Sequence, residues 1–169
     1  MNILLVDGYN IIGAWPELRR LKDEDLPAAR DLLIAKMAEY KAYTGFRVIV
    51  VFDAHLVQGI EKKKKDHTVE VIFTRENETA DERIEKLAQS LNNIKTQIHV
   101  ATSDFTEQWA IFGQGALRKS ARELRNEMLE IEKDIKQDVK SIQEKKPTAR
   151  IQLSSNIVEI FEKWRRGER

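Results

Sequence analysis

Short runs of hydrophobic residues alternate along the chain with longer segments in which hydrophobic residues recur every three or four positions. A short apolar run that ends at a turn signal is typical of a strand buried on both faces of a parallel sheet. Two such runs end directly before Asp7 and Asp53. The predicted strands comprise residues 2–6, 47–52, 68–73 and 97–101. The third is expected nearer to an edge of the sheet, because its first residues alternate between polar and apolar.

The segments with helical periodicity predict the helices of the fold, over residues 28–43, 79–91, 105–112, 117–142 and 154–164. Gly45 stands where a C-terminal glycine ends the first helix, and Thr79 and Glu82 have capping-box spacing at the start of the second. Strands that alternate with helices predict an α/β fold with a central, mostly parallel sheet and a long C-terminal amphipathic helix. We expect a single domain over residues 1–169, in which residues 116–169 form a helical C-terminal extension packed on or beside it.

Composition excludes several classes of protein. A chain of 169 residues buries enough surface to fold without a disulfide or a zinc ion. It contains no cysteine, which excludes thiol nucleophiles, CxxC redox centres and the usual structural zinc sites. No apolar run approaches the ~18 residues of a membrane span, and no signal-peptide pattern opens the chain. We therefore expect a cytoplasmic protein with no membrane partner, and the formal net charge of +1 gives no sign of a nucleic-acid partner.

Aspartates stand where a parallel sheet binds its ligands, which is outside the carboxyl ends of the strands. Asp7, Asp53 and Asp104 follow three of the predicted strands, and Asp81 lies in the first turn of the helix after the remaining strand. Carboxylates that converge raise each other's pKa unless a cation neutralises them. Mg²⁺ and Mn²⁺ prefer such oxygen ligands. The pattern therefore favours metal-assisted hydrolysis of a phosphodiester.

Each of these residues also has an ordinary structural interpretation. Asp7 and Asp53 are common turn residues, and Asp104 could cap the helix that follows it. Asp81 could complement the dipole at the start of its helix. Asn10 could hold a water or a phosphate oxygen, or it could form an Asx turn. The conjunction favours a site, because caps and turns do not require an aspartate at every strand end along one edge.

Four motifs of the chain resemble the PIN-like NYN nuclease domain. They are Leu-Val-Asp-Gly-Tyr-Asn at 5–10, Val-Phe-Asp-Ala at 51–54, Glu-Thr-Ala-Asp at 78–81 and Ala-Thr-Ser-Asp at 101–104. Their order and spacing match through residues 1 to about 115, and Gly-Gln-Gly-Ala-Leu-Arg-Lys-Ser-Ala-Arg-Glu at 113–123 makes the whole chain similar to the bacterial YacP subgroup. The resemblance implies a three-layer α/β/α architecture. It also implies an endoribonuclease that cleaves mRNA in association with the translating ribosome.

The same resemblance assigns roles to the polar residues at the strand ends. It implies that Asp7, Asp81 and Asp104 bind one or two Mg²⁺ or Mn²⁺ ions, and that Asn10 and Asp53 fill supporting positions. These five residues are the catalytic candidates. We expect products with 5′-phosphates, since a metal-bound water rather than the 2′-hydroxyl would be the nucleophile. No small-molecule organic cofactor is expected.

Two groups of basic residues are predicted to bind RNA through phosphate contacts, which give affinity without sequence information. They are Lys62, Lys63, Lys64 and Lys65 in the link between the second and third strands, and Arg118, Lys119, Arg122 and Arg125 on the long helix. Their alternative interpretations are a solvated loop and the polar face of an amphipathic helix. Tyr9 and Trp15, expected in the loop after the first strand, could stack on a base or be partly buried. The net charge thus averages an acidic site with basic surfaces and does not exclude RNA.

Three other functions remain open at the level of the sequence. The first is a phosphatase or phosphotransferase with Asp7 as nucleophile, although that chemistry usually places a second carboxylate two residues on, where this chain has Tyr9. The second is a non-catalytic RNA-binding or ribosome-binding protein with a PIN-like fold. The third is a toxin-type PIN ribonuclease, which would require an antitoxin encoded beside it.

Overall fold

The computed structural model describes residues 1–54, 69–103, 115–145 and 167. The chain divides into two compact units, Met1–Leu129 and Glu130–Arg169. The helices predicted over residues 105–112 and 154–164 lie outside the described residues.

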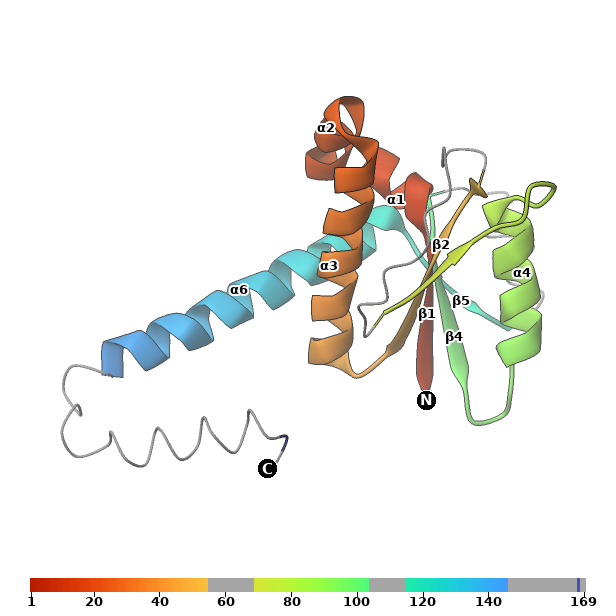
Figure 1. Ribbon diagram of the computed structural model, residues 1–169. Helices are drawn as coiled ribbons and strands as arrows, with labels where there is room; N and C mark the ends of the chain where they lie inside the picture. The colour runs from red at the N-terminus through yellow and green to blue at the C-terminus, as the bar shows by residue number, and fades with distance from the viewer. Residues whose placement is uncertain (55–68, 104–114, 146–166, 168–169) are drawn as a thin grey trace. The chain divides into compact units, whose positions relative to one another are not determined.

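A parallel sheet with the strand order β3-β2-β1-β4-β5 forms the centre of the first unit (Figure 1). The strands are β1 (Asn2–Asp7), β2 (Arg47–Phe52), β3 (Glu70–Phe73), β4 (Gln97–Ala101) and β5 (Leu117–Lys119). Every neighbouring pair runs parallel, with Asp7 beside Val51 of β2 and Val6 beside Ala101 of β4. The predicted parallel sheet is confirmed, and β1 is its central strand.

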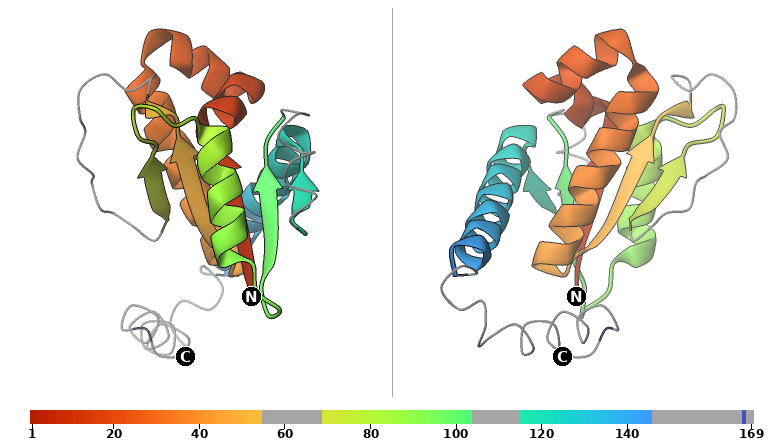
Figure 2. Two further views of the ribbon diagram at one scale, coloured as in Figure 1. Left: turned by 90° about the vertical axis from the view of Figure 1, so that its right-hand side faces the viewer. Right: turned by 60° about the vertical axis from the view of Figure 1, so that its left-hand side comes forward.

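Helices cover both faces of this sheet, as Figure 2 shows. The described residues of the first unit form the helices α1 (Gly8–Ala14), α2 (Pro16–Glu24), α3 (Leu26–Thr44), α4 (Ala80–Leu91) and the first turns of α6 (Ala121–Lys145). Helices α1 and α3 contact one face of the sheet, whereas α4 packs on the other. This arrangement confirms the three-layer α/β/α fold.

Two predicted helix boundaries are also confirmed, the end of α3 and the start of α4. Gly45 ends α3 in the left-handed conformation at a φ of 80°, where its N–H donates to the carbonyl of Lys41. The Thr79 hydroxyl accepts a hydrogen bond from the N–H of Glu82 at 3.2 Å and so caps α4. The short helix α1 replaces the loop that the sequence predicts after the first strand, and α2 is a further helix that begins at Pro16, a helix-start signal.

The long helix begins four residues later than its periodicity predicts. Residues Leu117–Lys119 form β5 beside β4, and α6 starts at Ala121. Ser120 separates the two elements, and its hydroxyl accepts a hydrogen bond from the N–H of Glu123 at 3.0 Å. Leu117 falls on the spacing of the apolar helix stripe, yet its side chain is 48% exposed. Strand pairing with β4, which periodicity does not encode, decides the conformation here.

The two faces of the sheet are buried under different helices. Ile3 and Leu5 of β1 and Val51 of β2 form a cluster with Ile84 of α4. The residues between them in the strands, such as Leu4, are also fully buried. Because successive side chains of a strand point to opposite faces, burial on both sides accounts for the continuous apolar runs.

In the second unit, the described residues continue α6 to Lys145. Its apolar residues Ile135, Val139 and Ile142 are exposed. Among the helices in the described ranges, none combines the length and the apolar character needed to cross a membrane.

Candidate active site

Three of the predicted site aspartates lie at the carboxyl edge of the sheet and on one face of it. Asp7 is the last residue of β1, and Asp53 follows directly after β2. Because side chains alternate along a strand, Asp7 shares the face of Leu5, and Asp53 continues the face of Val51. This is the face that α4 covers, and the first turn of α4 carries Asp81. The fold therefore directs three carboxylates from distant parts of the chain to one edge.

The fourth predicted carboxylate, Asp104, lies outside the described residues, directly after Ser103. Within the described ranges, no three His, Asp or Glu side chains gather closely enough to hold a metal ion. A three-ligand metal site at this edge therefore needs a ligand from outside those ranges, and Asp104 is the candidate. The donors that Asp7 and Asp81 supply are carboxylate oxygens, which fit Mg²⁺ or Mn²⁺.

The carboxylate of Asp7 is buried, with 6% of the residue exposed. The hydroxyl of Thr102, itself fully buried, donates to Asp7 Oδ2 over a long 3.5 Å. Asp7 stands at the N-cap position of α1, but its side chain makes no capping hydrogen bond there. A buried carboxylate is costly unless partners or a cation offset its charge. Burial without a capping role fits a site residue better than a turn residue on the surface.

Asn10 ties α1 to the loop that follows β4. Its Oδ1 accepts hydrogen bonds from the backbone N–H of Ser103 at 2.6 Å and from the Ser103 hydroxyl at 2.8 Å. The amide oxygen therefore spans two segments far apart in the sequence rather than forming a local Asx turn. Because Asp104 is the next residue along the chain, Asn10 holds the backbone immediately before a predicted metal ligand.

Gly8 allows α1 to start close against β2. A Cβ atom at this position would lie 2.3 Å from Cε1 of Phe52. The Phe52 ring is fully buried and contacts the rings of Tyr9 and Phe73, with centroid distances of 5.0 and 5.6 Å. The glycine of the Asp-Gly pair is thus explained by a close packing contact that fixes the backbone beside Asp7.

The four residues of the segment Glu-Thr-Ala-Asp at 78–81 have different structural roles. Glu78 is buried and pairs with Arg83 and Lys86, each at 2.9 Å. The hydrogen bond from Lys86, together with those from the Arg75 backbone and from Arg83, lowers the pKa of Glu78 to about 2. Thr79 caps α4, and Ala80 packs in the core. Glu78 is therefore an ion-paired anchor for the start of α4, which carries Asp81.

The two aromatic residues proposed for base stacking belong to helices rather than to a loop. Trp15 links α1 to α2 and is only 1% exposed, so of its two interpretations the structure supports burial and not stacking on a base. Its Nε1–H donates to the carbonyl of Ala121 at 2.9 Å. Tyr9 is half-buried on α1, and its hydroxyl accepts a hydrogen bond from Arg30 at 3.1 Å. Burial raises the pKa of Tyr9, although Arg30 partly opposes the shift.

Lys119 is predicted on the long helix, but it lies with Arg118 on β5, where it takes part in a network within the fold. It forms an ion pair with Glu127 of α6. The other carboxylate oxygen of Glu127 accepts a hydrogen bond from the Tyr40 hydroxyl of α3 at 3.3 Å. Burial, reinforced by the charge of Glu127, raises the pKa of Tyr40 well above its usual value. Lys119 thus helps to join β5, α6 and α3.

The three neighbouring arginines are placed differently. Arg125 pairs with Glu17 of α2 at 3.2 Å. Burial alone would raise the pKa of Glu17, but hydrogen bonds from its own backbone and from Arg125 lower it below its usual value. Arg118 and Arg122 are exposed. The remaining basic candidates, Lys62, Lys63, Lys64 and Lys65, lie outside the described residues.

This fold and this edge of carboxylates define a class of protein, the PIN-like nuclease domains that the sequence motifs resemble. The family model described as the YacP-like NYN domain matches residues 4–166. The chain belongs to the YacP-like NYN domain family, and the resemblance drawn from the motifs is confirmed.

Relatives and solved structures agree with this assignment. The chain is 69% identical to the protein YacP of Bacillus subtilis over 168 residues, which cover 99% of each chain. The crystal structure of Rae1 (YacP) from Bacillus subtilis superposes with a TM-score of 0.79 at 69% identity, covering 99% of this chain and 96% of that one. Its W164L mutant gives a TM-score of 0.77 at 65% identity, covering 98% and 96%. Membership of this nuclease family supports a nuclease or RNA-related role.

Proposed function

We propose that this protein is a divalent-metal-dependent endoribonuclease. The observation that carries the proposal is the placement of Asp7, Asp53 and Asp81 at one edge and one face of the parallel sheet. Ligands of parallel sheets bind at this edge. Carboxylates from three separate elements at this edge, with the predicted ligand Asp104 following β4, favour an oxygen-ligated metal over three unrelated structural roles.

Asp7, Asp81 and Asp104 would hold one or two Mg²⁺ or Mn²⁺ ions. When bound, such an ion lowers the pKa of a water molecule and offsets charge on the phosphate. Asp7 offers its carboxylate from a buried position, which limits its freedom to move. Asp81 comes from the first turn of α4, which is held by the Thr79 cap and the ion pairs of Glu78. Asp53 would support the ligands from the end of β2.

Asn10 acts in this proposal through Ser103. Its amide oxygen accepts hydrogen bonds from the backbone N–H and the hydroxyl of Ser103. These bonds would fix the backbone directly before Asp104. Cleavage would leave a 5′-phosphate and a 3′-hydroxyl, since a water molecule rather than the 2′-hydroxyl of the substrate would be the nucleophile. We further propose, on the resemblance to the YacP subgroup, that the substrate is mRNA on the translating ribosome in the cytoplasm.

The test is cleavage of end-labelled mRNA by the purified full-length protein with Mg²⁺ or Mn²⁺, with and without translating ribosomes. Asp7→Asn and Asp81→Asn should each lower the rate by at least about 100-fold, because a metal ligand is lost. Asp31→Asn is the matched control, since Asp31 is an exposed aspartate on α3 that belongs to none of the proposed ligands or supporting residues. EDTA should abolish cleavage, and added Mn²⁺ should restore it.

Each arm of this experiment decides one part of the proposal. Cleavage that requires ribosomes supports the complete assignment. Cleavage of naked RNA retains the nuclease and removes the ribosome from it. No cleavage in either arm, or full activity of Asp7→Asn, rejects the nuclease and leaves an RNA-binding or ribosome-binding protein with the same fold.

A further inference from the structure

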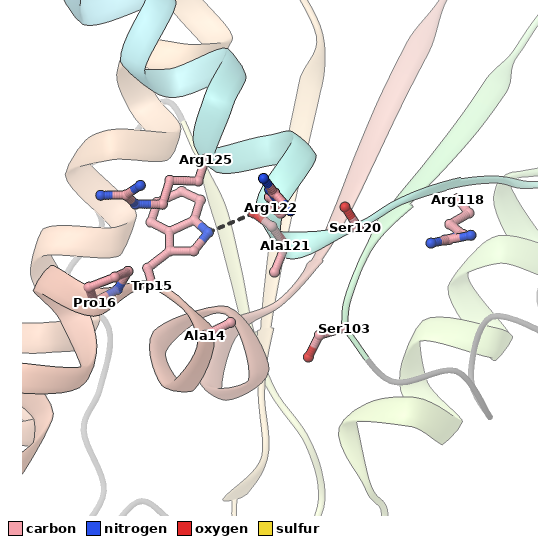
Figure 3. Close-up of a pocket in the computed structure, with 9 residues that line it drawn as sticks. All are labelled: Ala14, Trp15, Pro16, Ser103, Arg118, Ser120, Ala121, Arg122 and Arg125. Carbon is pink, nitrogen blue, oxygen red and sulfur yellow. Dashed lines mark hydrogen bonds between the residues drawn. The ribbon is translucent and has the colours of Figure 1, made fainter.

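A pocket of about 460 Å³ borders the candidate active site (Figure 3). One side is formed by Trp15 and Pro16 at the junction of α1 and α2, and the other by residues of β5 and the start of α6. Ser103, from the loop after β4, lies between them. The volume of the pocket is in the range of sites for small organic molecules and exceeds what a lone metal ion needs.

The two sides of this pocket are joined by a buried hydrogen bond. The indole N–H of Trp15 donates to the carbonyl of Ala121 at 2.9 Å, which Figure 3 marks as a dashed line. Trp15 is 1% exposed, so its ring supports the pocket from within the core. The pocket is therefore built into the fold rather than being a gap between mobile side chains.

Arginine side chains give the pocket its chemical character. Arg118 comes from β5, and Arg122 and Arg125 come from the first turns of α6. Arg125 is ion-paired with Glu17, whereas Arg118 and Arg122 are both exposed to solvent. Among the described residues that line the pocket, none is acidic. Arg122 is exposed and forms no ion pair within the described part of the chain.

We propose that this pocket binds a phosphate group of the RNA strand, next to the position where the strand is cut. Arginine forks match phosphate oxygens, and exposed guanidinium groups lose little hydration when they bind them. The apolar side formed by Ala14, Trp15 and Pro16 leaves room for the attached sugar or base. This inference rests on the proposed ribonuclease function and adds to it where the strand is held.

Ser103 connects the pocket to the carboxylate edge. The residue lines the pocket, and its backbone N–H and hydroxyl are both hydrogen-bonded to Asn10 of α1. Thr102, the residue before it, donates to Asp7. A strand whose phosphate binds in this pocket would therefore pass beside the loop that links the two sites.

The test measures binding of a fluorescein-labelled, unstructured RNA of about a dozen nucleotides by fluorescence anisotropy. The full-length protein is used in EDTA, so that affinity is measured without cleavage, at several KCl concentrations. The variants are Arg122→Ala, Arg118→Ala and, as a control that also removes one positive charge, Lys95→Ala. Lys95 is exposed and precedes the amino end of β4, at the opposite edge of the sheet.

Arg122→Ala should weaken RNA binding by roughly fivefold to tenfold at low salt and reduce the slope of log Kd against log salt by about 0.7. Arg118→Ala should act in the same direction, and Lys95→Ala should change Kd by less than about twofold. Equal affinities for all three variants would overturn the proposal. So would tight binding of a free 5′-mononucleotide that Arg122→Ala abolishes while RNA affinity is unchanged. If Asp7→Asn loses cleavage and Arg122→Ala has no effect on RNA binding, the phosphate-binding role of the pocket is rejected and the proposed nuclease function is retained.

Discussion

Replacing Asn10 by alanine separates a positioning role from a direct catalytic one. Among the described residues of the loop after β4, the Asn10 amide oxygen accepts two hydrogen bonds, both from Ser103. Alanine removes both bonds without adding bulk. Asp104, the predicted metal ligand, then follows a backbone that is no longer held at this point.

The expected loss of stability is small. A hydrogen bond within a protein contributes about 0.5–1.5 kcal/mol, and the lower end applies because Ser103 is exposed and water can replace the lost acceptor. Alanine also has a higher helix propensity than asparagine, by roughly 0.5 kcal/mol, which offsets part of the loss in α1. We therefore expect Asn10→Ala to lower the free energy of unfolding by about 1 kcal/mol or less. The effect on catalysis should be larger, since a misplacement of about 1 Å can cost about 100-fold in rate.

The assay pairs urea denaturation with single-turnover cleavage at saturating RNA and Mg²⁺. Ser103→Ala keeps the N–H bond and removes only the hydroxyl bond, so its rate should fall less than that of Asn10→Ala. In the double variant the effects should not add, because both residues act through one contact. Asn126→Ala, at an exposed position of α6, is the control for loss of an asparagine.

Two results would refute this reasoning. A rate of Asn10→Ala equal to wild type would show that the contact with Ser103 does not position the site. Fully additive effects of Asn10→Ala and Ser103→Ala would show that the Asn10 amide acts on its own, for example on water or phosphate.

Two further predictions concern the supports of the site. Gly8→Ala should lower the free energy of unfolding by about 1–3 kcal/mol, because its Cβ would overlap the Phe52 ring. In urea denaturation, Phe52→Leu should reduce that cost, and strict additivity of the two changes would contradict the packing explanation. Glu78 has a folded-state pKa of about 2 against a usual 4.5, so its ionised form stabilises the fold fully above pH 4.5 and progressively less as the pH falls toward 2. Wild type should therefore exceed Glu78→Gln in stability at neutral pH, with a difference that shrinks in that acid window. A difference independent of pH would assign the role of Glu78 to packing rather than to charge.

The fold could be predicted from the sequence where burial leaves a simple pattern. Both faces of β1 and β2 are covered, so each strand is a continuous apolar run. β5 could not be found in this way, because it has only three residues and pairs with β4 from across the chain. The helix α2 was missed because few of its residues are buried, and Leu18 is the one in the core.

The site shows the same division between local and long-range information. The aspartates at the ends of β1 and β2 follow from strand pattern and topology, since parallel strands present their carboxyl ends at one edge. The bonds from Ser103 to Asn10 join residues 93 positions apart, and no local rule connects them. The burial of Trp15 depends in the same way on Ala121, which lies 106 positions away.

Ser103 belongs to both proposed sites, but each site also depends on a residue that the other lacks. Their effects can therefore be separated by experiment. Its two hydrogen bonds to Asn10 set the backbone before Asp104, and the same residue lines the arginine pocket. Loss of Asn10 should therefore act mainly on the cleavage rate of bound RNA, because the arginines remain in place. Loss of Arg122 should act mainly on Kd, because the carboxylate edge is untouched. Because Asn10 acts on the position of Asp104 and Arg122 acts on RNA binding, their effects should be independent. A variant that lacks both residues should have the cleavage rate of the Asn10 variant and the Kd of the Arg122 variant.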